Sequence, residues 1–405
     1  MRGASAERSS LLFQAARFRK GQKPAPEKLE EALEWTTAQY PRSVAPGWCS
    51  RELSDRDITE ALMGVKAESS PGLPWLHFAS TKGGVIESFG AQLYEAVHAR
   101  IALIRSVTVD FIRSLSAMEL VLGGFVDPIR VFVKNEFHTV EKCRTGRYRL
   151  ICSLSIVDEV VERLLYSNQN KIEIASWLDI PSKPGIGFTD AMNREVWNRR
   201  KDVVLAGKAA WADISGWDWN VKQWMLEADS EIRSRLVWGV GADEFRALAA
   251  VQSSIMENNV FVLSSGEMFA QVEPGIMLSG RYVTSSTNSR MRILAARLVG
   301  AEWADAAGDD SLEDYVPGAL ESYDSMGLLV KYYEKCSDGR FSFCSHEYSE
   351  EACFLESWEK GLLNLLQGPY DEASHSQFLY ASRGSPPLRG CVELIPRSGW
   401  IRKDG

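Results

Sequence analysis

The stretch AAGDDSLE, residues 306–313, decides how this sequence is interpreted. Asp309 and Asp310 are adjacent behind a glycine, and residues 302–307 and 312–316 can pair as a hairpin with GDD at the bend. A hairpin tip would hold both carboxylates rigidly and point them outward together. Two such charges about 4 Å apart repel by roughly 4 kcal/mol at an effective dielectric near 20, and Mg²⁺ is a natural hard-oxygen partner. The alternative is an ordinary surface turn.

A second source of carboxylates lies upstream, in WADISGWDWN (211–220). Asp213 and Asp218 are separated by four residues at a strand-to-turn boundary that a Ser-Gly pair interrupts. Asp213 beside the hairpin would complete a two-metal clamp, which holds the attacking and leaving oxygens of an in-line phosphoryl displacement. Trp217 and Trp219 flank Asp218, and we expect a locally extended backbone here to turn both rings away from it.

Between these two stretches lies SGRYVTSSTN (279–288). Ser279 and Gly280 form a flexible turn, and Thr284 and Asn288 follow four residues apart, on one face of a helix. An amide and a carboxylate, Asn288 with Asp218, can share hydrogen bonds to a pair of ribose hydroxyls. An ordinary capped helix is the alternative interpretation of this segment.

Charge is distributed unevenly over the 405 residues, whose net charge is −8. Residues 130–149 carry six Lys or Arg against two Glu, and residues 281–297 carry four Arg and no acid (Arg281, Arg290, Arg292, Arg297). Two basic segments in an acidic protein predict positive charge gathered in a channel, whereas solvated helix faces are the alternative. The balanced apolar and charged composition excludes wholesale disorder. The sequence contains no apolar run of eighteen residues, so it offers no candidate transmembrane segment.

These three patterns, in this order, resemble motifs A, B and C of the RNA-dependent RNA polymerases of positive-strand RNA viruses. The resemblance extends to SSPGLPW (69–75) as motif G, KNEFHTVEKCRTGRYRLICSLS (134–155) as motif F, GLLVKYYEK (327–335) as motif D and FSFCSHEY (341–348) as motif E. The segments VDEVVERLL (157–165) and FCSH (343–346) are most similar to those of the sobemovirus, polerovirus and barnavirus polymerases.

Helices and short strands mix without βαβ regularity, which predicts an α+β fold. Strands are expected over 129–137 and 149–156, and helices over 84–122, 157–178 and 350–366. The resemblance implies a right-hand polymerase fold with an antiparallel palm sheet. Its regions would be fingers at 1–165 and 223–265, palm at 166–222 and 266–349, and thumb at 350–405.

The resemblance also implies a role for each motif residue. Metal binding and catalysis fall to the aspartates, and a motif D lysine protonates the leaving group; Lys335 matches by spacing, with Lys331 as the competitor. The catalytic set is Asp213, Asp309, Asp310 and Lys335. Sugar and nucleotide selection falls to Asp218, Ser279, Gly280, Thr284 and Asn288. Triphosphate binding falls to Lys134, Lys142, Arg147 and Arg149, and template or primer contact to Ser70, Gly72, Cys344 and His346.

The implied activity is RNA-dependent RNA synthesis that replicates a positive-strand viral genome, with Mg²⁺ as cofactor and Mn²⁺ as a substitute. Its partners would be a single-stranded RNA template, nascent RNA and ribonucleoside triphosphates, with a viral protein primer or other replicase proteins as further candidates. The expected location is the host cytoplasm, in membrane-associated replication complexes.

Two other functions compete with polymerisation: a non-catalytic RNA-binding protein of the same shape, and a small-molecule two-metal phosphohydrolase. The phosphohydrolase would not need the basic segments. For the cluster of Cys336, Cys344, His346 and Cys353, packed free thiols are favoured over a zinc site, since the short C-x₂₋₄-C spacing is missing. Residues 1–20 are interpreted as a terminus packed on the fold, with a basic targeting segment as the alternative.

Overall fold

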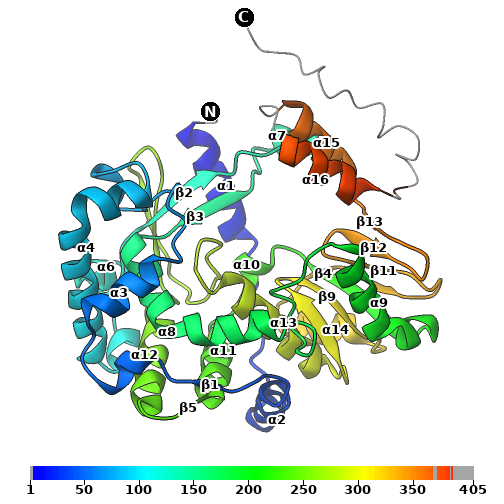
Figure 1. Ribbon diagram of the computed structural model, residues 1–405, viewed down its shortest axis with the longest axis horizontal. Helices are drawn as coiled ribbons and strands as arrows, with labels where there is room; N and C mark the ends of the chain where they lie inside the picture. The colour runs from blue at the N-terminus through cyan, green and yellow to red at the C-terminus, as the bar shows by residue number, and fades with distance from the viewer. Residues whose placement is uncertain (1–2, 368–371, 384, 386–405) are drawn as a thin grey trace, which may run out of the picture.

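Two four-stranded sheets organise the chain, one in each half of the molecule (Figure 1). The computed structural model describes residues 3–367, 372–383 and 385. One sheet, here called the fingers sheet, has the order β3-β2-β6-β7 and consists of β2 (Ile129–Val133), β3 (Leu150–Ser153), β6 (Val260–Val262) and β7 (Met268–Ala270). The other, the palm sheet, has the order β10-β4-β9-β8 and consists of β4 (Ala209–Ile214), β8 (Ala304–Ala307), β9 (Asp310–Asp314) and β10 (Val330–Lys335).

Helices cover the fingers sheet and share one apolar core with it. In β2, Ile129 and Val131 are fully buried and alternate with half-buried residues, as expected for a strand with one face on a core. The surrounding elements are η1 (Gly47–Ser50), α3 (Asp55–Leu62), η2 (Trp75–His77), α4 (Lys82–Arg105), α5 (Val109–Arg113), α6 (Ala117–Leu122), α7 (Val140–Arg144), α8 (Ile156–Ala175) and α12 (Ala242–Ile255), with the short parallel pair β1 (Ser43–Val44) and β5 (Val237–Trp238).

The palm sheet packs on a second core, whose central element is α13 (Thr284–Val299). Every pairing in this sheet is antiparallel, as predicted. A small sheet, β11 (Phe341–Phe343), β12 (His346–Tyr348) and β13 (Cys353–Leu355), borders it. The other elements on this side are α2 (Pro26–Thr37), α9 (Asp190–Leu205), α10 (Trp217–Asn220), α11 (Gln223–Leu236) and α14 (Ala319–Ser325).

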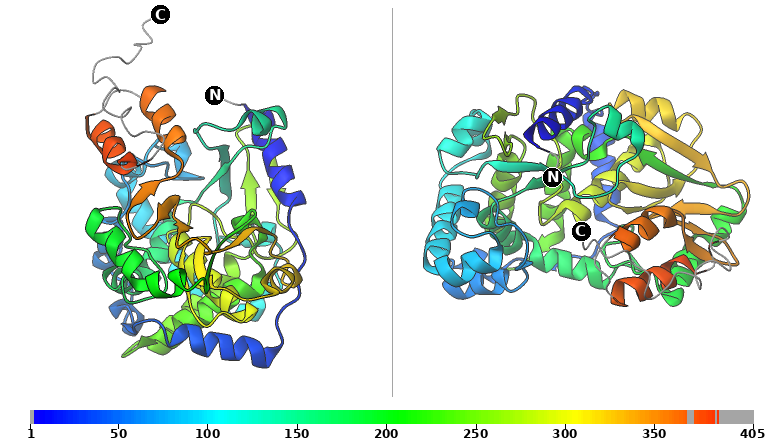
Figure 2. Two further views of the ribbon diagram at one scale, coloured as in Figure 1. Left: turned by 90° about the vertical axis from the view of Figure 1, so that its right-hand side faces the viewer. Right: turned by 90° about the horizontal axis from the view of Figure 1, so that it is seen from above.

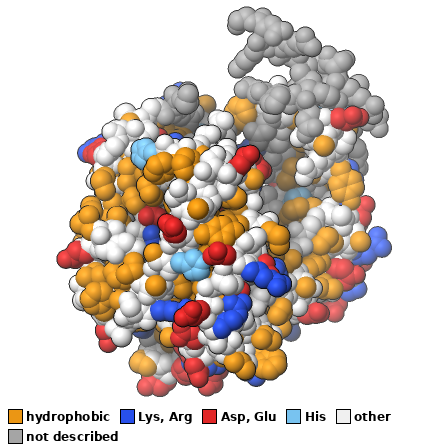
Figure 3. Space-filling model, turned by 60° about the vertical axis from the view of Figure 1, so that its left-hand side comes forward, with side chains coloured by type: hydrophobic (Ala, Val, Ile, Leu, Met, Phe, Trp, Pro, Cys, Tyr) orange, Lys and Arg blue, Asp and Glu red, His pale blue; other side chains and the backbone are white. Residues whose placement is uncertain are grey.

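Helices α15 (Trp358–Gln367) and α16 (Glu372–Ser382) stand above the small sheet, across from α1 (Ala4–Ala16), as both views in Figure 2 show. Acidic and basic side chains are interspersed on the face in Figure 3, so that face carries no continuous basic surface. Within the described segments, no helix is both long and apolar enough to cross a bilayer.

The predicted α+β class is confirmed, but some local predictions differ from the structure. The helix expected over 350–366 begins only at Trp358, because residues 353–355 pair with β12 as a strand. Pairing with β12 makes residues 353–355 the third strand of the small sheet, and this tertiary pairing overrides the local helical pattern. The predicted boundary at 165 falls inside α8, and that at 265 separates the paired strands β6 and β7. Residues 386–405 of the predicted thumb lie outside the described residues.

Candidate active site

Three aspartates meet where β4 ends beside the β8–β9 hairpin. Strand β9 pairs with β4 in a register that sets Ser311 opposite Ala212, so Asp310 and Asp213 are neighbours one step further along. Gly308 at the bend has φ +69, a left-handed conformation that favours glycine, and Asp309 follows at the tip. The sheet register therefore gathers the three carboxylates that the sequence analysis singled out.

The carboxylates repel one another. Desolvation, with added repulsion from Asp309 and Asp213, raises the pKa of Asp310 to about 7. The side chain of Asp309 reaches solvent, yet desolvation by the surrounding protein and repulsion from Asp213 also raise its pKa. The nearest compensating cation is Lys331, whose Nζ lies 2.8 Å from an Asp213 oxygen.

This oxygen-rich, repulsive cluster suits a hard divalent cation, which would relieve the repulsion. Across residues 3–367, 372–383 and 385, however, no three His, Cys, Asp or Glu side chains already surround one ion position. The donor set fits Mg²⁺ chemically, while Lys331 holds the Asp213 carboxylate in this arrangement.

Asp218 and Asn288, which were predicted to share a ribose, are hydrogen-bonded directly to each other. Asn288 Nδ2 donates to Asp218 Oδ1 at 2.9 Å, and Asn288 Oδ1 accepts from Trp217 Nε1 at 2.9 Å. The expected extended backbone is wrong: residues 217–220 form the helical turn α10, so the Trp217 ring is buried behind Asn288. Burial raises the pKa of Asp218 to about 6, which the Asn288 hydrogen bond opposes and Asp309 reinforces.

The turn before α13 packs against the fingers sheet. Ser279 Oγ accepts from Cys152 N of β3 at 3.3 Å, and a Cβ on Gly280 would lie 2.0 Å from Cys152 O, so only glycine permits this approach. Thr284 Oγ1 donates to the carbonyls of Leu278 and Arg281, both at 2.9 Å. Thr284 thus fixes the turn through its two hydrogen bonds.

The first basic segment forms a loop between β2 and β3. Glu136, which sequence reasoning did not single out, is its hub: Lys134, Arg149 and Lys360 of α15 lie 3.3, 3.3 and 3.0 Å from its carboxylate. These cations hold the pKa of Glu136 down to about 2 despite the opposing effect of burial.

The rest of the loop is also strongly positive. Burial and the positive charges of Arg149 and Arg147 lower the pKa of Lys142. These three predicted triphosphate ligands therefore lie within electrostatic range of one another. Arg149 also acts electrostatically on Asp218 and Asp309. The loop therefore lies within electrostatic range of the carboxylate site.

The second basic segment does not line a channel, and that prediction is wrong. Arg281 pairs with Glu162 at 2.6 Å, and the fully buried Arg290 and Arg292 pair with acids on other elements. Their partners are Glu173 and Asp229 for Arg290 and Glu313 for Arg292, whereas Arg297 pairs with Glu31 at the surface. The acids lie far away in sequence, so a local count of charge could not reveal the pairing.

Lys331 lies at the aspartates, and Lys335 does not. Strand β10 pairs Tyr332 with Asp213 and Val330 with Ile214, which makes Lys331 the extra residue of a β-bulge. Lys335 pairs opposite Ala210, three residues or roughly 10 Å further along the strand. Its Nζ lies over the Tyr315 ring at 4.8 Å.

The predicted template and primer residues lie on two sides of the site. Ser70 Oγ accepts from Gly72 N at 3.4 Å, and Gly72 (φ +71) has its Cα against Leu154 O, just after β3. Cys344 forms the β11–β12 turn, and burial together with Asp310 and Asp309 raises its thiol pKa. His346 Nδ1 is hydrogen-bonded to the carbonyl oxygen of Cys344 at 2.8 Å, and the His346 ring stacks on Phe188.

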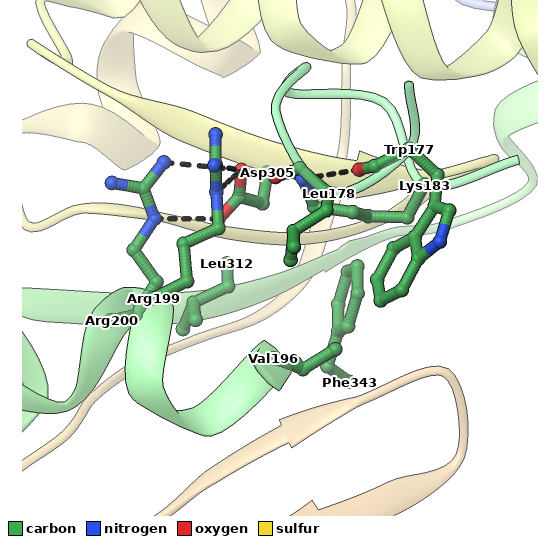
Figure 4. Close-up of a pocket in the computed structure, with 9 residues that line it drawn as sticks. All are labelled: Trp177, Leu178, Lys183, Val196, Arg199, Arg200, Asp305, Leu312 and Phe343. Atoms are coloured by element: carbon green, nitrogen blue, oxygen red, sulfur yellow. Dashed lines mark hydrogen bonds and ion pairs between the residues drawn. The ribbon is translucent and has the colours of Figure 1, made fainter. Parts of the chain in front are cut away.

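Two residues that the sequence analysis missed anchor the β8–β9 hairpin. Ser289 Oγ accepts from Gly308 N at 2.9 Å, which ties the hairpin to α13. Asp305 of β8 is buried among Lys183, Arg199 and Arg200, at 3.4, 3.3 and 2.5 Å (Figure 4). Neither had a motif signal, because their partners come from distant segments.

Comparisons with known proteins agree with this geometry. The sequence model of a family described as "Viral RNA-directed RNA-polymerase" matches residues 1–358. The chain is 41% identical over 387 residues to the "Replicase polyprotein P2AB" of Southern cowpea mosaic virus, covering 91% of this chain and 39% of the polyprotein. It is 34% identical over 411 residues to "Protein P1-P2" of Potato leafroll virus, covering 93% of this chain and 37% of that protein.

The chain therefore spans about two fifths of the length of these curated relatives. Among solved structures, "Sicinivirus 3Dpol RNA dependent RNA polymerase" superimposes with a TM-score of 0.63 at 15% identity, covering 89% of this chain and 77% of that one. That likeness confirms the predicted fold. The predicted resemblance to sobemovirus and polerovirus replicases is confirmed as well.

Proposed function

The chain belongs to the family of viral RNA-directed RNA polymerases, and on this premise we propose that it copies a viral positive-strand RNA by two-metal nucleotidyl transfer. The observation that carries the proposal is the sheet register that brings Asp213 beside Asp309 and Asp310. Desolvation, together with repulsion from Asp309 and Asp213, raises the pKa of Asp310 to about 7, which supports a site made for cations.

In the proposed reaction, the 3′-hydroxyl of the nascent RNA loses its proton to solvent, and its oxygen attacks the α-phosphorus of a ribonucleoside triphosphate. The new O–P bond forms as the bond to the bridging oxygen of the β-phosphate breaks, and pyrophosphate leaves. Two divalent cations held by Asp213, Asp309 and Asp310 would supply charge stabilisation to the attacking and leaving oxygens. The residues of the chain orient the triphosphate, select its sugar and supply a proton.

The triphosphate is proposed to bind the loop that carries Lys134, Lys142, Arg147 and Arg149. Guanidinium forks match phosphate oxygens and stay charged at every working pH. The electrostatic influence of Arg149 on both Asp218 and Asp309 supports its location between the sugar site and the metal site. Glu136 would act as a substitute anion for Arg149 until phosphate arrives, because it holds that side chain at 3.3 Å.

The ribose is proposed to be recognised by Asp218 and Asn288. Asn288 fixes the Asp218 carboxylate through a 2.9 Å hydrogen bond and is itself fixed by Trp217. Such a rigid acceptor is suited to a 2′-hydroxyl donor. The leaving pyrophosphate would take its proton from Lys331, whose contact with Asp213 supports this assignment over Lys335.

The test is nucleotide incorporation by the purified chain with an RNA template, four ribonucleotides and Mg²⁺ or Mn²⁺. Asp213→Asn and Asp309→Asn should each abolish incorporation while the melting temperature and the far-UV spectrum stay native, because each removes a charge that the cations require. Near wild-type incorporation by either variant would contradict the two-metal assignment.

A matched control is Asp338→Asn, an exposed aspartate near Arg340 in the turn before β11. It should incorporate nucleotides at the wild-type rate. A wild-type chain that binds RNA yet never extends it, at any metal concentration, would instead favour the non-catalytic RNA-binding alternative.

A further inference from the structure

Helix α1 runs along the fingers sheet and ends beside α10, as Figure 1 shows in dark blue. Its start is anchored by Glu7, whose Oε2 accepts from the backbone N and the Oγ of Ser264, at 2.8 and 2.7 Å, in the β6–β7 turn. The side chains on the rest of the helix reach two segments of the proposed active site. No sequence motif in residues 1–20 pointed to such contacts.

The first contact is with the basic loop. Ser10 is fully buried, and its Oγ donates to Gly146 O at 2.8 Å and accepts from Tyr148 N at 2.9 Å. Ser9 Oγ also donates to Gly146 O, at 3.1 Å. Ser10 therefore provides hydrogen-bond partners for the Gly146 carbonyl and the Tyr148 N–H, the two backbone groups on either side of Arg147.

The second contact passes through an aromatic ring. The guanidinium carbons of Arg147 and Arg17 lie 5.1 and 5.6 Å from the centroid of the Phe13 ring. Both distances are within the range of cation–π attraction. Phe13 thus holds two like charges, one from the basic loop and one from the end of α1, against the same ring.

The third contact reaches the turn after β4. Arg17 Nη2 donates to Ser215 Oγ at 2.7 Å, and a Cβ on Gly216 would lie 2.8 Å from this guanidinium. Ser215 and Gly216 separate Asp213 from Asp218 in the sequence. Arg17 therefore packs on the turn that connects the proposed metal site with the proposed sugar site.

We propose that α1 is a positioning element for the incoming ribonucleoside triphosphate, in which Ser10, Phe13 and Arg17 couple the loop of Arg147 and Arg149 to the turn after Asp213. This inference rests on the proposed function, since it concerns the triphosphate of that reaction. None of the three residues touches the substrate. They fix the loop before binding, so the triphosphate does not bear the entropy cost of ordering it.

The competing explanation is that α1 only covers apolar surface, because Leu11 of this helix is buried in the fingers core. The two explanations differ in what they predict for triphosphate affinity. A mere cover affects the melting temperature alone, whereas a positioning element changes the KM for nucleotide with little change in kcat or in RNA affinity.

The experiment uses the full chain with Ser10→Ala, Phe13→Leu, Arg17→Ala and Arg17→Lys. KM and kcat for ATP are measured on an oligo-uridylate template, RNA dissociation constants at fixed salt, and melting temperatures for every variant. Loss of the two Ser10 hydrogen bonds should raise the KM about 5- to 10-fold, the effect of one or two neutral hydrogen bonds. Arg17→Lys should recover part of the loss caused by Arg17→Ala, since it keeps the charge but not the planar fork.

Arg8→Ala is the matched control, because Arg8 lies on the same helix in an exposed pair with Glu267. It should leave KM, kcat and RNA affinity unchanged. Lower melting temperatures with an unchanged KM in the Ser10, Phe13 and Arg17 variants would overturn the inference, and so would an equal loss of RNA affinity.

Equilibrium binding of ATP to the same variants, measured by calorimetry, provides the comparison without turnover. A wild-type chain that incorporates no nucleotide would contradict the proposed function, and calorimetry would still test the coupling. An active wild type whose variants bind and use ATP normally would contradict the coupling alone.

Discussion

Replacing Asn288 by Ala probes the proposed sugar site most directly, because this buried amide makes two hydrogen bonds of 2.9 Å. One is donated to the Asp218 carboxylate, and the other is accepted from the Trp217 indole. Alanine deletes both. We expect the variant to fold but to discriminate less well between ribonucleotides and deoxyribonucleotides.

The magnitude follows from the two bonds. The bond to Asp218 is charge-assisted, worth about 1.5–3 kcal/mol. If its loss releases the carboxylate from the ribose 2′-hydroxyl, discrimination falls by roughly 10- to 150-fold at 1.4 kcal/mol per decade. The Trp217 N–H, in a side chain that is only 1% exposed, is left without its partner. That buried donor should lower the free energy of unfolding by about 1–3 kcal/mol.

The assay compares kcat/KM for ATP and dATP on one template, together with unfolding in urea. Trp217→Phe is the control: it removes the indole donor but leaves the Asn288–Asp218 bond, so stability should fall while most of the discrimination remains. A ratio of ATP to dATP that stays within twofold of wild type in Asn288→Ala would refute the sugar-reading role.

Three further predictions concern charged residues. Arg149→Ala should lower kcat/KM for nucleotide by about 10- to 150-fold, as one charge-assisted contact is worth about 1.5–3 kcal/mol; an equal loss of RNA affinity would make Arg149 a template contact instead. Lys331→Ala should lower kcat by about 10²-fold, as expected for a general acid, and Lys335→Ala should change it little; the reverse order in single-turnover rates would restore Lys335 as the acid. Asp305→Asn should lower the free energy of unfolding in urea by about 3–5 kcal/mol, because it removes the carboxylate that faces the buried Lys183 and the half-buried Arg199 and Arg200; a loss below about 1 kcal/mol would show that the cluster is not an anchor.

The sequence predicted much of the site because the motif residues work through local geometry. A glycine at a hairpin bend followed by two aspartates indicates the tip of the hairpin wherever that hairpin packs. The proximity of Asn288 and Asp218 was also predictable, because an amide and a carboxylate in two separate motifs offer complementary groups to one ribose; their direct hydrogen bond was not predicted. The thiol cluster carried no such complementarity, and its cysteines are free in the described part of the chain.

Local pattern failed where a partner decides the outcome. Lys331 lies at Asp213 because a β-bulge in β10 shifts the register by one residue, and spacing in the sequence pointed to Lys335. Arg290 and Arg292 of α13 were predicted to line a positively charged channel, and they are neutralised by acids from α8, α11 and β9 instead. Charge counted along the chain measures composition, whereas burial beside an opposite charge is a property of packing.

The sequence by itself therefore determined the family, the α+β class and the identity of the carboxylates, because these depend on residue types and their order. Only the tertiary structure decided that β4 and the β8–β9 hairpin bring Asp213 and Asp310 side by side, that Glu136 gathers the basic loop, and that α1 contacts both that loop and the turn after Asp213. The physical reason is the range of the interactions. Turn and helix preferences act between near neighbours in the chain, whereas sheet register, buried ion pairs and helix docking join groups on different elements, which are 198 residues apart in the case of Arg17 and Ser215.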